Sequence, residues 1–484
     1  MKSLNYIITE TEKITSFDPL DADKTLNLPV MRMLYSTPIQ IDANNTLVSN
    51  VLKSFSYDPE STTIHLKVQS DLTFSDGSPI RTRDIALAIS RMISARPTFP
   101  VLKDIEGVEA WIKDTQELST YPSGMSVGEK TIDIKLNRNH PNPLFRFCLE
   151  IFSIIPEKCI DLKTNKLTCE RPASSGYYVI EKETENQISF KKRREGVSFS
   201  EHVDFEELIF QYKKMENACS ELISDNTLIS GSEIGYILSN CEKIKNNFNL
   251  HWTAAARFGF VLFSAKNPVF KKSINRAYFA VKVREQLKKD HPAMLVTQSL
   301  FTSILPGFLN DQDFANDFSS VNLLDFKDQS FLYPETVSPA NSVIHHAIIQ
   351  TAESLGMKVK GIDAKFSSEK YETGESSVEM ASSGFWAQDP VGDLSMFFTK
   401  NLHRPLLFVW NDETHYKLLN KIESTTDSKS INEDMKMFNK HLSEESLIAP
   451  LLHFRRLFIT SKNTVKVSFP QAVTSPAPWQ FKFE

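Results

Sequence analysis

Residues 62–92, TTIHLKVQSDLTFSDGSPIRTRDIALAISRM, contain the patterns of a strand, a tight turn and a helix in immediate succession. Apolar and polar residues alternate over residues 62–68, which is typical of a half-buried strand. The Asp76-Gly77 step then favours a tight turn, because glycine adopts backbone angles that other residues avoid. The apolar residues that follow have helical spacing, and Asp84 falls in the first turn, where the helix dipole favours a negative charge. We therefore expect Asp76-Gly77 and Asp84 to have structural roles.

Strand and helix patterns alternate on both sides of this stretch. Alternating or β-branched residues predict strands, and apolar residues on one helical face predict helices. The sequence therefore predicts a mixed α/β or α+β protein with several lobes. The predicted strands cover residues 4–9, 130–136, 177–180, 188–192, 357–362 and, as one central strand, 447–459, and further helices cover residues 343–355 and 432–442.

Length and composition exclude several classes of protein. At 484 residues the chain is long enough for two or three domains of about 150 residues each. Its 41% hydrophobic and 24% charged residues argue against a disordered, collagen-like or membrane-spanning chain. The net charge of -5 argues against broad binding to nucleic acid, and the basic run 191–194, flanked by acidic residues, is interpreted as a solvated strand end. With only 15 glycines, a nucleotide-binding loop is disfavoured.

The sequence offers no motif for catalysis or metal binding. It contains no HExxH or His–carboxylate grouping for zinc, no GxSxG for a serine hydrolase and no CxxC. Residues 124–131 resemble a phosphate-binding loop, but the second glycine comes one residue early and Glu129 precedes the lysine. We therefore expect no catalytic residues, no bound metal and no cofactor. For a hydrolase, no pair of nucleophile and base can be named.

Five cysteines leave the redox compartment open. Cys159 and Cys169 flank one polar loop, and Cys219 and Cys241 flank a second segment. Two disulfides with a free Cys148 would suit an oxidising compartment. Five reduced structural cysteines are the equal alternative, and thiol counting with and without reductant distinguishes the two.

Several short motifs follow one another in a fixed order along the chain. They are Phe17-Asp18-Pro19 with Leu34-Tyr35, Phe74–Ile80 with Asp84-Ile85, Ser174–Tyr178, Asn267–Phe270 with Arg276-Ala277, Phe385–Pro390, and Ile448–Leu451. In this order they resemble the motifs of the family 5 extracellular solute-binding proteins, which are the oligopeptide- and dipeptide-binding components of ABC importers. The chain departs from the pattern at Ser383, where oligopeptide binders have an arginine that helps to hold the ligand carboxylate.

The resemblance implies a periplasmic-binding-protein-like fold of type II, with two lobes around a ligand cleft and three domains. Domain I, a discontinuous first lobe, would comprise residues 1–38, 171–252 and 455–484. Domain II, inserted into this lobe, would cover residues 39–170, and domain III, the second lobe, would cover residues 253–454.

The resemblance also implies candidate ligand-binding residues. A cleft that closes over a charged ligand terminus needs a partner charge, since an unpaired buried ion is very costly. By resemblance, Asp389 would pair with a ligand amine and Trp386 would pack over the ligand. The alternative is that Asp389 belongs to a plain turn and Trp386 to the core. The further candidates are Asp23 and Thr25, with a surface loop as the alternative, and Ser383, His453 and Phe454, with core packing favoured for Phe454.

The leading hypothesis is a receptor of an ABC importer, without enzymatic activity, that captures a peptide or another amine-bearing small solute. Its partners would be this ligand and the membrane permease subunits, with no nucleic acid, and it would be a monomer in the periplasm or outside the cell. A sensor or regulatory module of the same fold, cytoplasmic or at the surface, is one alternative. It is favoured by the expected lack of a signal peptide in this sequence, since no apolar stretch follows Lys2. A receptor for a metal chelate, an opine or an oligosaccharide is another, because fold similarity does not fix the ligand.

Overall fold

The structure, a computed structural model, describes most of the chain. The described residues are 3–8, 14, 16–21, 27–42, 46–114, 117–196, 203–212, 227–231, 246, 248–253, 255, 257–264, 266–292, 294–314, 317–335, 342–363, 370–371, 373–384, 389–392, 394, 413–425, 427–446, 448–455, 457–461, 466–467 and 481–482.

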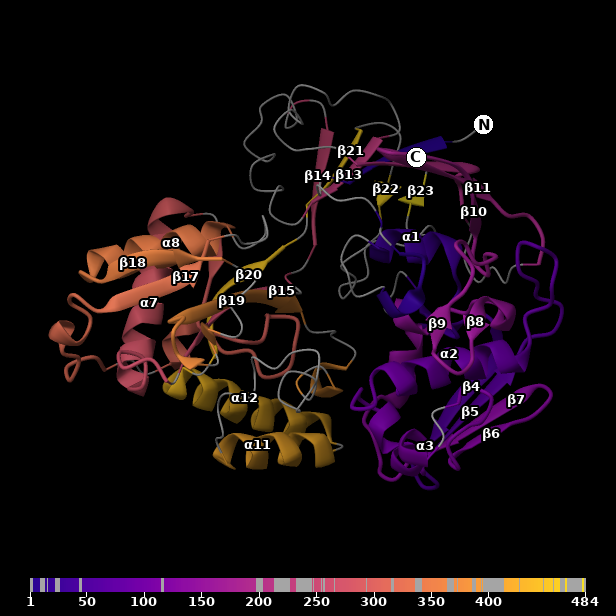
Figure 1. Cartoon of the computed structure of the whole chain (residues 1–484), viewed down its shortest axis with the longest axis horizontal. Helices are drawn as coiled ribbons and strands as arrows, with labels where there is room; N and C mark the ends of the chain where they lie inside the picture. The colour runs from indigo at the N-terminus through magenta and orange to yellow at the C-terminus, as the bar shows by residue number, and fades with distance from the viewer. Residues whose placement is uncertain are drawn as a thin grey trace. The chain divides into compact units, whose positions relative to one another are not determined.

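The chain folds into two compact units (Figure 1). Unit 1 consists of Met1–Thr253 together with Arg456–Glu484, and unit 2 consists of Ala254–Arg455. Both are mixtures of helices and strands, which confirms the predicted α/β class. The finer division into three domains stays a prediction.

Unit 1 is rich in strands and short helices. Its described elements are β1 (Ser3–Ile8), η1 (Pro19–Asp21), α1 (Asn27–Leu34), β2 (Ile39–Ile41), β3 (Leu47–Ser49), β4 (Leu52–Asp58), β5 (Thr63–Val68), α2 (Thr82–Ala95), η2 (Leu102–Asp104), α3 (Val108–Asp114), β6 (Met125–Val127), β7 (Thr131–Lys135), η3 (Pro143–Cys148), η4 (Glu150–Phe152), η5 (Glu157–Cys159), β8 (Ile160–Asp161), β9 (Lys166–Leu167), β10 (Tyr178–Thr184), β11 (Gln187–Lys192), β12 (Glu207–Tyr212), β13 (Thr227–Gly231), β14 (Phe248–Trp252), β21 (Leu457–Ser461), β22 (Lys466–Val467) and β23 (Phe481–Lys482).

The main sheet of unit 1 has the strand order β10-β11-β12-β1-β13-β21-β14. The predicted first strand is confirmed as β1, which runs parallel to both β12 and β13. Tyr6 and Phe190 each contact Phe210, with ring centroids 4.8 and 4.9 Å apart, and all three side chains are buried. Aromatic residues from three neighbouring strands thus pack on one face of the sheet.

The stretch that begins at residue 62 folds as predicted. β5 lies between β4 and β7 in a four-stranded antiparallel sheet with order β4-β5-β7-β6, and its apolar residues point to the buried face. The Asp76 carboxylate accepts a hydrogen bond from Ser78 N at 3.0 Å, and Gly77 has φ +82°. Asp84 accepts from Arg81 N at 2.8 Å at the start of α2. These contacts confirm the structural roles of Asp76-Gly77 and Asp84.

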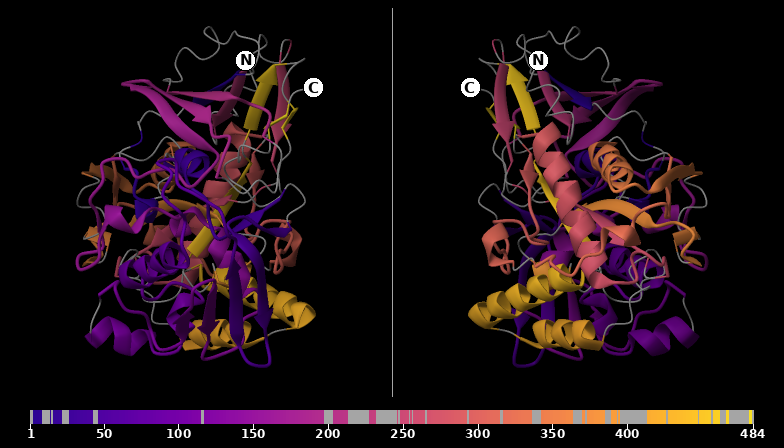
Figure 2. Two further views of the ribbon diagram at one scale, coloured as in Figure 1. Left: turned by 90° about the vertical axis from the view of Figure 1, so that its right-hand side faces the viewer. Right: turned by 90° about the vertical axis from the view of Figure 1, so that its left-hand side faces the viewer.

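Unit 2 is built around the sheet β16-β20-β15-β19. Along β15, Phe258, Phe260 and Leu262 contact one core cluster, whereas Val261 and Phe263 contact a second one. Successive strand residues point to opposite faces, so both faces of this sheet are covered. Helices α11 and α12 contribute to the first cluster and α7 and α8 to the second, and Figure 2 shows α11 and α12 side by side.

The described elements of unit 2 are β15 (Arg257–Phe263), α7 (Ser273–Asp290), β16 (Leu295–Val296), η7 (Asp311–Asp313), η8 (Leu323–Asp325), β17 (Ser330–Pro334), α8 (Ser342–Ser354), β18 (Lys358–Ile362), β19 (Val378–Gly384), α11 (Glu413–Ser424), α12 (Ser428–Glu445) and β20 (Ile448–Phe454).

One predicted element is wrong. Residues 447–459 do not form a single central strand: β20 ends at Phe454, and β21 begins at Leu457. β20 pairs with β15 and β16 in unit 2, whereas β21 pairs with β13 and β14 in unit 1. The apolar run is continuous because both strands are buried in their own sheets, although the chain passes from one unit to the other between them.

The basic run 191–194 is only partly solvated. Lys191 and Arg194 are exposed, as expected for a strand end. Arg193, in contrast, is 8% exposed, and it donates to the backbone carbonyls of Thr73, Ser174 and Gly176 at 2.8, 2.9 and 3.1 Å. It is buried because these loop carbonyls need a donor.

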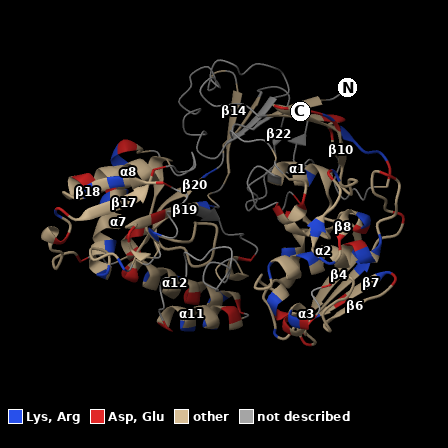
Figure 3. Cartoon of the chain, in the orientation of Figure 1, with Lys and Arg blue, Asp and Glu red and all other residues tan. Residues whose placement is uncertain are grey.

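The described cysteines include one disulfide, between Cys159 and Cys169, and a buried free thiol at Cys148. Cys219 and Cys241 lie outside the described residues. Basic and acidic residues are interspersed along the elements of each unit (Figure 3). None of the described helices is long and apolar enough to cross a membrane.

Candidate functional site

Three candidate residues of unit 2, Ser383, His453 and Phe454, lie at one end of its sheet. β15 is antiparallel to both β19 and β20, so those two strands end beside the start of β15. Ser383 and His453 lie opposite Phe258 on its two sides, in one row across the sheet. In the next row, Phe454 lies opposite Arg257. Residues separated by about 70 positions in sequence therefore lie at the same sheet end.

His453 is held in the interior of the unit. Its ring is 7% exposed, and Nε2 lies 2.8 Å from the carbonyl oxygen of Ser299. Burial lowers the pKa of His453 to about 4, so the ring is neutral near pH 7. Nε2 then carries the proton, because a carbonyl oxygen only accepts. This nitrogen is used within the protein, which favours a structural role over ligand contact.

Phe454 packs against the core cluster that includes Ile344 and Val261. A Cβ at Gly259 would lie 2.4 Å from Ile344 Cδ1 and 2.9 Å from the Phe454 ring. Glycine is therefore required at position 259 for these two side chains to approach the strand. The contacts agree with core packing for Phe454.

Asp389 is buried and begins a short helical turn. Its side chain is 6% exposed, and Oδ1 accepts from Gly392 N at 3.0 Å, which is the contact of an N-cap residue. Val391 and Leu394, in the same turn, contribute to the core cluster that faces α11 and α12. The turn thus fixes the orientation of the carboxylate.

The remaining candidates are placed only in part. Ser383 is located by its backbone in β19. Trp386, Asp23 and Thr25 lie outside the described residues. Their ligand-binding roles stay predictions.

The structure also contains a polar cluster that the sequence did not reveal. Arg91 Nη2 lies 3.0 and 2.8 Å from the two carboxylate oxygens of Asp18, and Arg91 Nε donates to Asn165 Oδ1 at 2.8 Å. Asp18 belongs to the Phe17-Asp18-Pro19 motif, and this motif was the only signal that the position matters. The two partners are 73 and 74 residues away from Arg91, so no local pattern predicts the contacts.

The Arg276-Ala277 motif of unit 2 has a structural explanation. The Arg276 guanidinium donates to the carbonyls of Phe270 at 2.8 Å and Glu445 at 2.6 Å, which connects α7 to the preceding loop and to the end of α12. Arg284 Nε donates to Pro450 O at 2.8 Å in β20. Burial lowers the pKa of both arginines to about 10, and both remain charged near pH 7.

Unit 1 contains a hollow of about 570 Å³. It is lined by the end of β5, the start of α2 and the β6–β7 turn, including Arg81, Glu129 and Lys130. Its charges are mixed, and its described lining includes none of the candidate residues. Among the described residues, no group of three or more His, Cys, Asp or Glu is arranged to hold a metal ion.

Solved structures of low sequence identity share this fold. AgaA from A. tumefaciens R10 in complex with agropinic acid has a TM-score of 0.77 at 16% identity, covering 100% of this chain and 99% of that one. NikA from Brucella suis in complex with Fe(III)-EDTA has a TM-score of 0.77 at 12% identity, covering 100% of both chains. DppA from Helicobacter pylori in complex with the peptide STSA has a TM-score of 0.76 at 13% identity, covering 100% of this chain and 98% of that one. The fold is thus that of the periplasmic binding proteins.

The family follows from the sequence match. The model of the bacterial extracellular solute-binding proteins, family 5 (middle part), matches residues 46–287, which is half of the chain, and the protein belongs to this family. No curated protein sequence matches the chain. The family consists of solute-binding receptors and not of enzymes.

Proposed function

We propose that the protein is the receptor of an ABC importer that captures a peptide or another small amine-bearing solute, with Asp389 as the partner of the amine. The observation that supports this most is the burial of Asp389. The residue is 6% exposed, and its carboxylate is held in a fixed orientation by the hydrogen bond from Gly392 N. An ammonium group is the ligand chemistry that such a carboxylate favours, because hydrogen bonds between charged partners are the strong ones. Trp386, three residues earlier, would supply an aromatic wall over the solute.

Capture by closure of the two units is supported by the path of the chain. The chain passes from unit 1 to unit 2 after Thr253 and returns after Arg455. A small number of connections is typical of proteins that close by a hinge, because few backbone angles need to change. β15 begins and β20 ends beside these connections, so His453 and Phe454, at the end of β20, would lie next to the proposed hinge.

Native mass spectrometry of the protein as purified tests the proposal. The expected result is a protein peak with the added mass of a peptide or another amine-bearing compound, which disappears after partial unfolding and dialysis. Tandem fragmentation of the released compound then shows whether it carries an amine. A released compound without any basic nitrogen would reject Asp389 as the ligand partner.

A non-peptide solute is the second candidate. Two of the structural neighbours are complexes with agropinic acid and Fe(III)-EDTA. Ligand mass separates the two candidates: a series of peptide masses supports the first, and one defined mass of an opine, sugar or chelate supports the second. A sensor or regulatory role in place of transport would use the same solute site.

The remaining features of the proposal follow the family. The partners would be the solute and the permease subunits of the transporter, and the protein would act as a monomer in the periplasm or outside the cell. It would bind its solute without changing it, so the compound released from the protein should have the mass of the compound supplied.

A further inference from the structure

The short segment of residues 16–21 in unit 1 is organised around Asp18. Oδ1 of Asp18 accepts from Leu20 N at 3.0 Å, and the Asp18 carbonyl accepts from Asp21 N at 2.9 Å. Asp18 N donates to Ser16 Oγ at 3.1 Å. These contacts shape η1, which precedes positions 23 and 25, the candidate ligand residues of unit 1, in the sequence.

Two arginines, Arg91 in helix α2 and Arg96 directly after its end, hold this segment. Arg91 contacts both carboxylate oxygens of Asp18, and Arg96 Nη2 donates to Leu20 O at 3.1 Å. The Arg91 side chain is only 3% exposed and that of Asp18 is 16% exposed. The pair is therefore screened little by solvent, and its geometry matters more than that of a surface ion pair.

Arg91 is itself held in place by a second partner. Its Nε donates to Asn165 Oδ1 at 2.8 Å, while Asn165 Nδ2 donates back to Arg91 O at 3.0 Å. Asn165 has φ +57° in the turn between β8 and β9, and its amide N–H donates to Asp161 O at 2.9 Å. Asn165 thus fixes the direction in which the guanidinium points.

The β8–β9 hairpin that presents Asn165 has few contacts of its own. Its strands pair at only two positions, Ile160 with Leu167 and Asp161 with Lys166. A two-stranded hairpin is at best marginally stable by itself. The Cys159–Cys169 disulfide closes the hairpin at its base, and Thr168 N donates to Cys159 O at 2.8 Å beside it.

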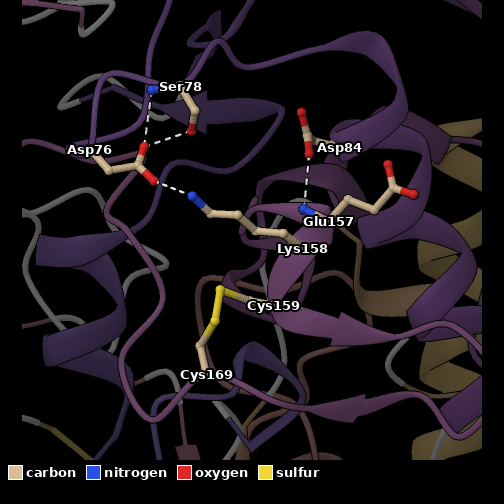
Figure 4. Close-up of a disulfide and its surroundings, with 7 residues drawn as sticks. All are labelled: Asp76, Ser78, Asp84, Glu157, Lys158, Cys159 and Cys169. Carbon is tan, nitrogen blue, oxygen red and sulfur yellow. Dashed lines mark hydrogen bonds and ion pairs between the residues drawn. A yellow bond between two sulfur atoms is a disulfide. The ribbon is translucent and has the colours of Figure 1, made fainter.

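The base of the hairpin is fastened to the turn and helix that precede it in sequence. Lys158 Nζ lies 2.5 Å from Asp76 Oδ2, and Glu157 N donates to Asp84 Oδ1 at 3.1 Å (Figure 4). The disulfide therefore connects an anchored strand, β8, to the otherwise weakly held strand β9.

We infer that the disulfide-closed hairpin, residues 159–169, is a positioning device that orients Arg91 through Asn165 and thereby fixes the Asp18 segment, which precedes the candidate ligand residues Asp23 and Thr25 in the sequence. The orienting contacts stand independently of the ligand. The consequence for solute affinity rests on the proposed function, in which Asp23 and Thr25 face the solute.

Hydrogen–deuterium exchange of the amides in residues 16–21 tests the inference on the whole chain, without any solute. Wild type and Arg91→Ala are compared with and without a dithiol. The dithiol breaks the Sγ–Sγ bond, supplies two electrons and two protons to give two thiols, and is itself oxidised to a disulfide. Reduction is expected to speed exchange in wild type, roughly tenfold, since loss of one well-placed charged hydrogen bond is an effect of that size.

The decisive result is the combination of the two changes. If the hairpin acts through Arg91, reduction adds nothing to the fast exchange of residues 16–21 in Arg91→Ala. If reduction and Arg91→Ala each speed exchange by their own factor and the two factors multiply, the inference is overturned. An unchanged exchange rate after reduction of wild type would also overturn it. Lys163→Ala, which alters an exposed residue of the same turn, is the matched control and should behave as wild type.

A second variant covers the case in which Arg91→Ala does not fold. Asn165→Ala keeps the pair of Asp18 and Arg91 and the 3.3 Å contact of Arg91 Nη2 with Asn165 O, but it removes both side-chain contacts of Asn165 with Arg91. Exchange at residues 16–21 should therefore rise and respond less to the dithiol than in wild type. A full wild-type response in Asn165→Ala would contradict the route through Asn165. Because no solute is used, a failure of the proposed function leaves these outcomes unchanged.

Discussion

One guanidinium nitrogen of Arg91, Nη2, lies 2.8 and 3.0 Å from the two carboxylate oxygens of Asp18, across 73 residues of sequence. Both side chains are largely buried, so each charge depends on the other for its stability. This contact connects the N-terminal segment of unit 1 to helix α2.

Removal of one partner of this pair is expected to destabilise unit 1 strongly. Asp18→Ala leaves the Arg91 charge buried without its carboxylate, and such losses cost about 3–5 kcal/mol. Urea unfolding measures the change. Glu181→Ala, which breaks the exposed pair with Lys191, is the control and should cost about 1 kcal/mol or less. Equal effects of the two variants would contradict the importance of burial.

Asp389 is expected to act on affinity through its charge and on stability through its cap. Asp389→Asn keeps an acceptor for Gly392 N, because asparagine is a good N-cap residue, but it removes the charge. Asp389→Ala removes both and should lower the free energy of unfolding by about 1 kcal/mol.

Calorimetry with the solute recovered from the protein distinguishes these two roles. Both variants should lose at least tenfold in affinity, since a charged hydrogen bond contributes about 1.5–3 kcal/mol. Affinity that is unchanged in Asp389→Asn would reject the carboxylate as the anchor of the amine.

The lowered pKa of His453 leads us to expect a loss of stability in mild acid. Its pKa in the folded protein is about 4, below the value of about 6.5 for an unfolded histidine, so the unfolded state binds the proton more readily. The stabilisation is complete above pH 6.5 and is lost as the pH falls towards 4, and it amounts to a few kcal/mol, about 1.4 for each pH unit.

Thermal unfolding between pH 4 and pH 7.5 checks this, with His453→Gln as the matched variant. Glutamine can still donate to Ser299 O but does not titrate. Its melting temperature should therefore fall less steeply than that of wild type over this range. Parallel curves for the two proteins would show that His453 does not cause the acid sensitivity.

A side chain at position 259 is expected to destabilise unit 2 unless the neighbouring Ile344 is shortened. Gly259→Ala would place a Cβ 2.4 Å from Ile344 Cδ1, and overpacking of this kind costs about 1–3 kcal/mol. Ile344→Val removes that Cδ1 atom, so the double variant should recover part of the loss in urea unfolding. A simple sum of the two single effects would show that this contact is not the cause.

Much of the fold could be predicted because its signals are local. The alternation in β5, the Asp76-Gly77 turn and the helical spacing of α2 each lie within a few residues, and the structure confirms them. The prediction of one central strand over residues 447–459 was wrong because the pairing that separates its two halves is not local. Two buried strands in different sheets give the same apolar pattern as one long strand.

The site was less predictable. Asp389 and His453 were named from a family resemblance, and only the structure shows that each makes a hydrogen bond within its own unit. The contacts of Arg91 with Asp18 and Asn165 join residues more than 70 positions apart, and a single sequence contains no physical trace of such pairs.

The position of β21 determines the order in which unit 1 is completed. This strand lies between β13 and β14 and pairs with both, yet it is the first strand to follow the whole of unit 2 in the chain. During synthesis, the edges of β13 and β14 that pair with β21 therefore have no β21 to pair with until more than 200 further residues have been added. The main sheet of the unit that begins the chain is thus completed only after unit 2 has been synthesised, and unpaired strand edges of this kind favour aggregation until then.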